Sequence, residues 1–246
     1  MCIRDRALVL AAGWATRLGD LTGGRPKHLL PIGSRTALDF VVDRLGAVPS
    51  IEHVSVITHD VGCPAFIDWS VSRSSPPTVS ILSDRTNSVE NRLGSIGDMA
   101  FFIREANPND DLIIVAGDNV FDFDLTPLAS AAQKNIVVGL YDVESYELAS
   151  RYGIVAIDAN NRITSFVEKP EHPKSTLAAV AIYGFPRDKL AVIQNYLNAG
   201  GSPDQSGALI EWLYTQEHIV GHVFDGRWID IGGADEYHRA IQEFGP

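Results

Sequence analysis

The order of hydrophobic and polar positions predicts strands and helices that follow one another in turn. Short apolar runs typical of buried strands occur at 7–10, 54–58, 79–82, 112–116 and 136–143. Apolar residues at helical spacing predict helices between these runs, at 36–46, 64–72, 93–106 and 126–134. Strands that alternate with helices favour a parallel sheet with helices on both faces.

The second half of the chain has a different pattern. Strands at 152–157 and 163–167 flank Asp158-Ala159-Asn160-Asn161, which predicts a β-hairpin turn. Further strands and helices are expected at 177–185, 188–197, 208–214, 219–224, 227–231 and 234–244. The predicted fold class is therefore α/β, with a mostly parallel sheet and an added antiparallel part. In such sheets ligands bind at the carboxyl ends of the strands.

Composition limits the function. The 246 residues carry a net charge of −11, which argues against a broad nucleic-acid surface. Cys2 and Cys63 form neither a disulfide framework nor a metal-ligand spacing. Because no apolar run approaches membrane-spanning length and no signal-peptide pattern opens the chain, we expect a cytoplasmic protein without a membrane partner. Residues 1–5 are interpreted as a non-native extension without a function.

Candidate phosphate-binding chemistry lies between Ala7 and Gly33. The first strand runs into the small residues Ala11-Ala12-Gly13, and the cations Arg17 and Lys27 follow. Small residues let the backbone approach a ligand closely, and backbone N–H groups with nearby cations hold phosphate. An ordinary turn with surface charges remains the alternative on these residues alone.

Two other phosphate loops are excluded. Gly13-Trp14-Ala15 lacks the second glycine of the dinucleotide fingerprint, and Gly24 is followed by Arg25-Pro26 instead of the Lys-Ser/Thr pair of a P-loop.

Instead, Leu10-Ala11-Ala12-Gly13-x-x-Thr16-Arg17-Leu18, followed by Pro26-Lys27 and Leu30-Pro31, resembles the signature of the sugar-phosphate nucleotidyltransferases. The similarity is greatest to the glucose-1-phosphate thymidylyltransferase type. It implies one Rossmann-like, GT-A-like nucleotidyltransferase domain over 1–246, in which the hairpin adds a sugar-binding part. It also implies that the loop wraps a nucleoside triphosphate, through Leu10, Ala11, Ala12, Gly13 and Thr16, with Arg17 and Lys27 as catalytic cations.

The resemblance also implies that two acids hold Mg²⁺. Asp118 follows the apolar run 112–116, and Asp230 lies in Trp228-Ile229-Asp230-Ile231-Gly232, which matches a Trp-x-Asp-x-Gly element of the family. Mg²⁺ is commonly held by one or two carboxylates together with substrate phosphates, so two acids suffice. By spacing alone, a turn residue that caps the next segment is the alternative for Asp118.

The resemblance also assigns the sugar and base sides. Glu168-Lys169 matches the family's Val-Glu-Lys-Pro motif, in which Glu contacts sugar hydroxyls and Lys the sugar phosphate, and Tyr152-Gly153 matches its sugar-side Tyr-Gly. Tyr183 lies where the family has an aromatic near the sugar, although a core tyrosine is an equal alternative. The resemblance further implies that Asn87, Leu93 and Gly94 contact the base of the nucleotide.

The resulting hypothesis is transfer of a nucleotidyl group from dTTP or UTP to a sugar 1-phosphate such as glucose 1-phosphate. Arg92 stands where the family has glycine, so the sequence does not choose between thymidine and uridine. The alternatives are a cytidylyltransferase for phosphocholine or a similar phosphorylated alcohol, and a silent homologue that binds NDP-sugar. Asp122-Phe123-Asp124 has the Asp-x-Asp form of a glycosyltransferase but is interpreted as a turn. No general base is expected, and His28 is interpreted as a structural or substrate-edge contact. Homo-oligomers are common in the family.

Overall fold

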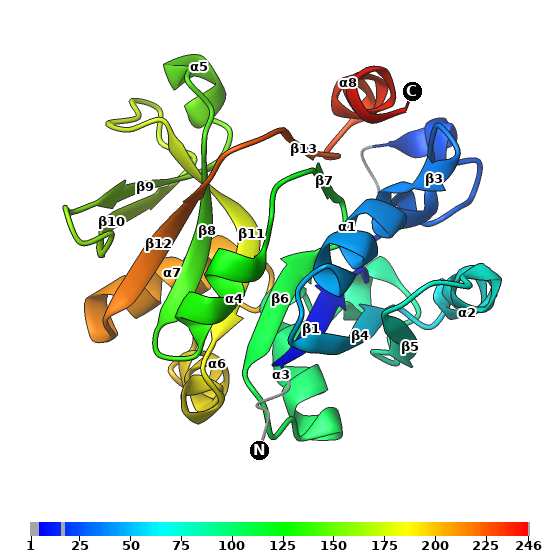
Figure 1. Ribbon diagram of the computed structural model, residues 1–246, viewed down its shortest axis with the longest axis horizontal. Coiled ribbons are helices and arrows are strands. Elements are labelled where there is room, and N and C mark those ends of the chain that lie inside the picture. The colour runs from blue at the N-terminus through cyan, green and yellow to red at the C-terminus, as the bar shows by residue number, and fades with distance from the viewer. Residues whose placement is uncertain (1–4, 16–17, 246) are drawn as a thin grey trace.

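The computed structural model describes residues 5–15 and 18–245 and has a mixed sheet at its centre (Figure 1). Strands β1 (Asp5–Leu10), β4 (Ile51–Thr58), β5 (Thr78–Ser83) and β6 (Leu112–Ala116) pair in parallel, in the order β6-β1-β4-β5. This arrangement confirms the parallel sheet that the alternating pattern predicts.

The antiparallel part begins at β11 (Leu177–Phe185), which joins the parallel strands by pairing with β6. On its other side β11 pairs with β8 (Ile136–Asp142) and β9 (Gly153–Ile157). Strand β9 forms the predicted hairpin with β10 (Ile163–Glu168), and β12 (Ile219–Phe224) lies parallel to β8. The α/β fold class with an added antiparallel part is confirmed.

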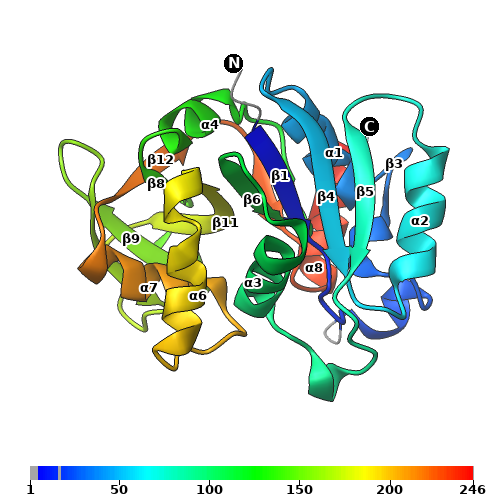
Figure 2. The same cartoon turned by 90° about the horizontal axis from the view of Figure 1, so that it is seen from below.

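Helices cover the two faces of the sheet because side chains alternate along each strand. On one face, α1 (Ala37–Gly46), α2 (Cys63–Ser72) and α4 (Thr126–Ala132) pack on a core that contains Ala7 and Val9. On the other face, α3 (Ser95–Ala106), α6 (Ala191–Asn198) and α7 (Ser206–Gln216) pack on a core that contains Leu8. Figure 2 shows α3, α6 and α7 together on one side of the strands and α4 on the opposite side.

A smaller layer lies above the carboxyl ends of the parallel strands. Here β13 (Trp228–Asp230) pairs with β7 (Asn119–Phe121), and α8 (Ala234–Phe244) packs beside the short strands β2 (Pro31–Ile32) and β3 (Arg35–Thr36). Ile229 and Ile231 are fully buried within it. The layer therefore anchors the last helix next to the loop that follows β1.

Local sequence signals explain several element boundaries. Thr36 caps α1 as predicted, in a capping box in which its hydroxyl accepts from the Asp39 N–H and Asp39 accepts from the Thr36 N–H. The remaining short elements are α5 (Tyr146–Ala149) and 3-10 turns at Gly19–Thr22, Lys27–Leu29, Val89–Asn91 and Arg187–Lys189.

Some boundaries differ from the prediction. Helix α3 begins at Ser95 rather than at 93, because Gly94 has a φ of 79°, which a right-handed helix does not allow. The helix expected at 188–197 is divided into a 3-10 turn and α6. Asp122-Phe123-Asp124 lies in the β7–α4 connection, where Asp124 accepts from the Thr126 N–H, so the turn interpretation is confirmed. Within the described residues, no helix has the length and apolar character needed to span a bilayer.

Candidate active site

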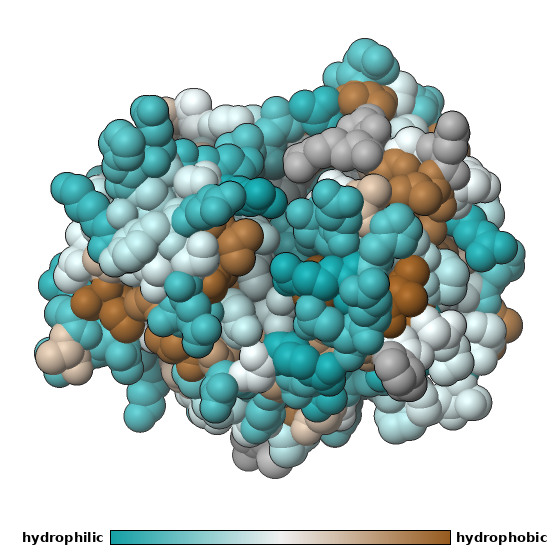
Figure 3. Space-filling view, turned by 90° about the horizontal axis from the view of Figure 1, so that it is seen from above, coloured by the Kyte–Doolittle hydropathy of each residue, from teal (hydrophilic) through white to brown (hydrophobic). Residues whose placement is uncertain are grey.

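A cavity of about 520 Å³ lies at the carboxyl ends of β1 and β6, which end at Leu10 and Ala116. This is where an open α/β sheet binds its ligands, and it is the location that the sequence predicts for the site. The cavity has two ends. At one end lie Gly13, Lys27, Asp118 and Asp230, and at the other Asp84, Arg92, Gly94 and Asp98. Figure 3 shows this end of the molecule, where hydrophilic side chains surround a hollow.

Lys27 and Asp118 form an ion pair at the first end of the cavity. Both side chains are mostly buried, with 16% and 20% of their surface exposed. Burial raises the pKa of the Asp118 carboxyl, but the Lys27 ammonium and its hydrogen bond outweigh this effect and keep the pKa below its ordinary value. Asp118 is therefore an ionised carboxylate at neutral pH.

His28 lies beside this pair and is 2% exposed. Its burial, followed by the positive charge of Lys27, lowers the pKa of the imidazole to about 3. Within the described residues, no hydrogen-bond partner reaches the shielded Nδ1 atom. At neutral pH His28 is uncharged and a weak base, which supports its interpretation as a contact residue.

The β7–β13 pairing brings Asp118 and Asp230 together from opposite halves of the sequence. Asp230 is the register partner of Asn119, and the Ile231 N–H donates to the Asp118 carbonyl at 2.9 Å. Asn119 also accepts from the Trp228 indole at 2.7 Å, which holds the two strands together. Both carboxylates line the same cavity, as the metal hypothesis requires.

The charge of the cavity is unusual for a phosphate site. Among the described lining residues, the acids outnumber the cations Lys27 and Arg92; these acids are Asp84, Asp98, Asp118, Asp204 and Asp230. Within the described residues, no cluster of three or more His, Cys, Asp or Glu side chains forms a metal cage. The donor set fits a hard cation that takes two carboxylates and completes its shell with phosphate oxygens. Thr16 and Arg17 lie outside the described residues.

The second end of the cavity contains a buried pair of acids, Asp84 and Asp98, which are 3% and 5% exposed. Asp84 follows β5 and accepts hydrogen bonds from the Thr86 N–H and hydroxyl at 2.7 and 2.8 Å. Asp98 lies one turn into α3. Its burial, and then the neighbouring Asp84 carboxylate, raise the pKa of the Asp98 carboxyl to about 8. Asp98 is therefore mostly protonated at neutral pH.

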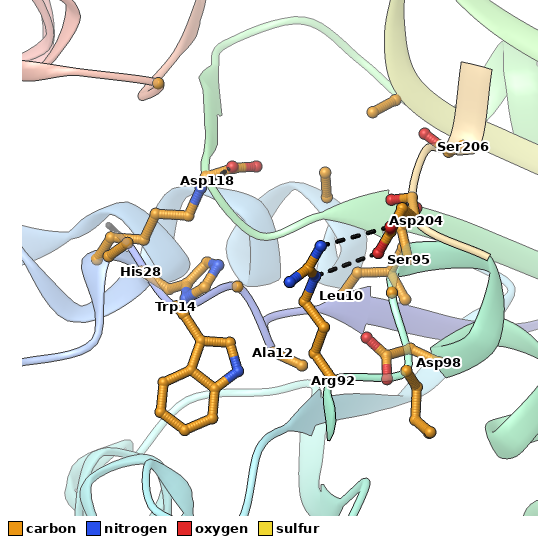
Figure 4. Close-up of a pocket in the computed structure, with 18 of the residues that line it drawn as sticks. Leu10, Ala12, Trp14, His28, Arg92, Ser95, Asp98, Asp118, Asp204 and Ser206 are labelled. Carbon is orange, nitrogen blue, oxygen red and sulfur yellow. Dashed lines mark hydrogen bonds and ion pairs between the residues drawn. The ribbon is translucent and has the colours of Figure 1, made fainter. Parts of the chain in front are cut away.

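An ion pair crosses the cavity next to these acids. Arg92 reaches Asp204 with its Nε and Nη2 atoms at 3.2 and 3.4 Å, as Figure 4 shows. Ser95 supports the same segment by donating to the Asp204 carbonyl at 3.0 Å. A Cβ at Gly94 would lie 2.5 Å from the Pro203 carbonyl, so glycine permits this close approach.

Only some of the residues predicted to contact the base line the cavity. Leu93 and Gly94 line the cavity, as do the loop residues Leu10, Ala12 and Gly13. Ala11 is buried in the core beside them. Asn87 does not belong to the lining, and its amide oxygen accepts from the Asn91 side chain at 2.9 Å.

The sugar-side residues gather next to the cavity around the start of α7. The Tyr183 hydroxyl donates to the hydroxyl of Ser206, a lining residue, at 2.8 Å. Glu168 is the register partner of Gly153. A Cβ at Gly207 would lie 2.5 Å from the carboxylate of Glu168. Glycines at 153 and 207 thus leave the space that the Glu168 side chain occupies.

Lys169 and Tyr152 lie farther along the same edge. The Lys169 ammonium is 3.6 Å from the Glu168 carboxylate. The backbone N–H of Lys169 donates to the Tyr152 carbonyl at 3.0 Å. The Tyr152 ring packs edge-on against Trp228, with centroids 5.1 Å apart, and lines a second cavity of about 210 Å³. The structure therefore brings the predicted sugar-side residues together, but none of the five belongs to the lining of the main cavity.

Several lining residues carried no signal in the sequence. Trp14 stacks on His59 with centroids 4.0 Å apart, and Trp14 occupies a position that the family signature leaves open. Asp84, Asp98 and Ser206 belong to no recognised motif. Only the chain path brings them to the cavity, so spacing along the sequence could not have identified them.

Comparison with known proteins identifies the family and the fold. The nucleotidyl transferase family profile matches residues 6–245. An Acinetobacter baumanii UDP-glucose pyrophosphorylase is 21% identical to this chain, with a TM-score of 0.81. The alignment covers 99% of this chain and 94% of the pyrophosphorylase. A UDP-glucose pyrophosphorylase complexed with UDP-glucose has 18% identity and a TM-score of 0.81, with 98% of each chain covered.

A Bacillus anthracis protein assigned as a glucose-1-phosphate thymidylyltransferase, solved with a sucrose, is 23% identical with a TM-score of 0.81. The alignment covers 98% of this chain and 95% of that one. These identities establish a shared fold. The family match over nearly the whole chain goes further and agrees with the resemblance of the Leu10–Pro31 signature: the protein belongs to the nucleotidyl transferase family.

Proposed function

We propose that this protein transfers a nucleotidyl group from dTTP or UTP to a sugar 1-phosphate, with glucose 1-phosphate as the acceptor. The observation that carries the proposal is the meeting of Lys27, Asp118 and Asp230 at one end of the cavity. A cation and two carboxylates at one place suit a reaction that brings two phosphate groups together.

The reaction is an in-line displacement at the α-phosphorus of the nucleotide. A phosphate oxygen of the sugar 1-phosphate forms the new bond, and the bond from the α-phosphorus to the oxygen that bridges it to the β-phosphate breaks. Pyrophosphate leaves with that electron pair. No proton has to be removed, because the attacking oxygen is already anionic. Catalysis then consists of positioning and charge neutralisation.

The residues of this chain would divide these tasks. Lys27, with Arg17 from the same loop, would neutralise the triphosphate, and Lys169 would bind the phosphate of the sugar. Glu168 would accept hydrogen bonds from sugar hydroxyls. Asp118 and Asp230 would hold Mg²⁺, which supplies positive charge in a cavity whose described acids outnumber its cations.

The names of the compared structures support the substrate class. Two are UDP-glucose pyrophosphorylases and one is assigned as a glucose-1-phosphate thymidylyltransferase. All share the fold of this chain, and the Glu168–Gly153 pairing and the Tyr183–Ser206 hydrogen bond supply polar groups for a sugar beside the cavity.

Pyrophosphate release tests the proposal. The protein is incubated with Mg²⁺ and glucose 1-phosphate, and dTTP, UTP, CTP, ATP and GTP are offered separately. Release with dTTP or UTP supports the proposal. Release only from CTP with phosphocholine would identify a cytidylyltransferase. If no pair of nucleotide and acceptor releases pyrophosphate but UDP-glucose or dTDP-glucose binds by calorimetry, the protein is a binding protein. That result would contradict the proposed reaction.

A further inference from the structure

The acid pair Asp84–Asp98 has no role in the reaction described above. It lies at the end of the cavity opposite Lys27 and Asp118, and both residues are more than nine-tenths buried. The described acids at this end are Asp84, Asp98 and Asp204, and the cation there, Arg92, is already paired with Asp204. A triphosphate is therefore poorly suited to this end. An uncharged part of the nucleotide suits it better, and the nucleobase is that part.

Asp84 and Asp98 differ in their hydrogen bonds. Asp84 accepts hydrogen bonds from the N–H and hydroxyl of Thr86. Within the described residues, no donor reaches the shielded Oδ1 atom of Asp98. Two carboxyl groups in contact share a proton more readily than both ionise, and the raised pKa of Asp98 agrees with a proton held between them.

A carboxyl group that shares its proton through one oxygen keeps the other as a hydrogen-bond acceptor. Asp98 lines the cavity, and Figure 4 shows its carboxyl group on the side facing Ala12 and Arg92. The nearby lining residues Leu10, Val89 and Leu93 are apolar, as is suitable for the faces of a flat ring. A buried acceptor beside apolar walls recognises an N–H group at the edge of a base.

We propose that Asp98, held by Asp84, reads the nucleobase by accepting a hydrogen bond from the ring N3–H of uracil or thymine. This inference rests on the proposed function, since it presumes that a uridine or thymidine nucleotide occupies the cavity. Asp98 is then a specificity-determining residue, and Asp84 positions it.

Binding of UTP and dTTP to the whole protein tests the proposal by calorimetry, with inorganic tripolyphosphate as a ligand that has no base. Asp98→Leu removes the acceptor and should raise the Kd of UTP roughly 10-fold or more. Tripolyphosphate should bind as before, because it needs only the Lys27 end. Asp98→Asn keeps a carbonyl oxygen and can donate to Asp84, so it should restore UTP binding to within about threefold.

An N3-methylated UTP, which lacks the proposed donor, provides a second arm. Wild type should bind it roughly 10-fold more weakly than UTP, whereas Asp98→Leu should discriminate far less. Asp111→Asn is the matched control, since Asp111 is a buried acid at the opposite end of β6, where it accepts from the Arg187 N–H. Equal loss of UTP and tripolyphosphate binding, or unchanged UTP binding in Asp98→Leu, would overturn the proposal.

A pH series gives a readout that a purely structural role would not change. The charged or titratable groups around Asp98 are Asp84, Arg92 and Asp204, together with His59, which faces Asp84. UTP affinity of wild type should rise as the pH passes about 8, because the ionised Asp98 carboxylate accepts a hydrogen bond more strongly, and that of Asp98→Asn should not. An identical profile for both would contradict a proton shared by the pair. These binding results are independent of turnover, so they remain interpretable if pyrophosphate release fails.

Discussion

Lys27 and Asp118 form a mostly buried ion pair between segments that are 91 residues apart in the sequence. Lys27 comes from the loop after β1, and Asp118 from the turn between β6 and β7. Each of the two charges stabilises the other in the absence of substrate. When phosphate and a cation enter, each can exchange this partner for the ligand, so the pair preserves both charges in the position where the reaction needs them.

Replacing Lys27 should therefore affect turnover more than folding. Lys27→Met removes the charge and keeps most of the apolar stem, and we expect kcat to fall roughly 10²-fold or more. Steady-state pyrophosphate release measures the effect, with thermal unfolding as the check on the fold. Lys134→Met, which removes an exposed lysine just beyond α4, is the matched control. Near-normal turnover in Lys27→Met would remove Lys27 from the mechanism.

Asp118 should determine the response to Mg²⁺. Asp118→Asn retains the shape but loses the negative charge, so we expect the Mg²⁺ concentration for half-maximal activity to rise roughly 10-fold or more. A Mg²⁺ titration of activity after treatment with a chelator measures it. Asp122→Asn serves as a control, because Asp122 lies in the β7–α4 connection and its carboxylate binds Arg227. A wild-type Mg²⁺ response in Asp118→Asn would show that the metal assignment is wrong.

Lys169 combines backbone strain with a proposed substrate contact. Its φ of 45° lies in the left-handed region, which costs a non-glycine residue about 1 kcal/mol or more. Lys169→Gly should raise the free energy of unfolding by about 0.5 kcal/mol once the greater flexibility of glycine is included. It should also raise the KM for sugar 1-phosphate roughly 10-fold or more through loss of the ammonium.

Asn161→Gly separates these two effects. Asn161 has a φ of 61° in the turn between β9 and β10, and no substrate contact is proposed for it. Urea unfolding and initial rates should show a similar or smaller gain in stability, with the KM for the sugar phosphate unchanged. An unchanged KM in Lys169→Gly as well would contradict the sugar-phosphate role of Lys169.

Asp98 should make the stability of the free protein depend on pH. Burial and Asp84 raise its pKa from 3.8 to about 8, so the folded protein holds a proton that the unfolded chain has released. Raising the pH from about 4 to about 8 therefore favours unfolding, by at most about 1.4 kcal/mol per pH unit. The contribution is fully present below about pH 4 and is lost as the pH rises through about 8.

The comparison with Asp98→Asn isolates this effect, since the amide does not titrate. The free energy of unfolding of Asp98→Asn minus that of wild type should grow steadily over this range. Urea titrations at about pH 5, 7 and 9 measure it. A difference that stays constant with pH would show that Asp98 is ionised throughout.

Local patterns were sufficient for the elements and the fold class. Continuous apolar runs such as 112–116 form central strands because a strand covered on both faces needs apolar residues throughout. Thr36 specifies the start of α1, since its cap depends only on Asp39 three residues later. The β1 loop was recognisable because its signature residues are close together in the chain.

The composition of the candidate site needed the tertiary structure. Asp118 and Asp230 could be paired in advance only by resemblance, because their proximity depends on β13 pairing with β7. Asp84 and Asp98 carry no motif, and their shared proton arises from burial that only the packed helix α3 imposes. Sequence alone therefore determined the strands, the helices and the phosphate loop through interactions between near neighbours. The tertiary structure decided which distant charges meet, because their burial and electrostatic coupling exist only once the sheet and its covering helices have formed.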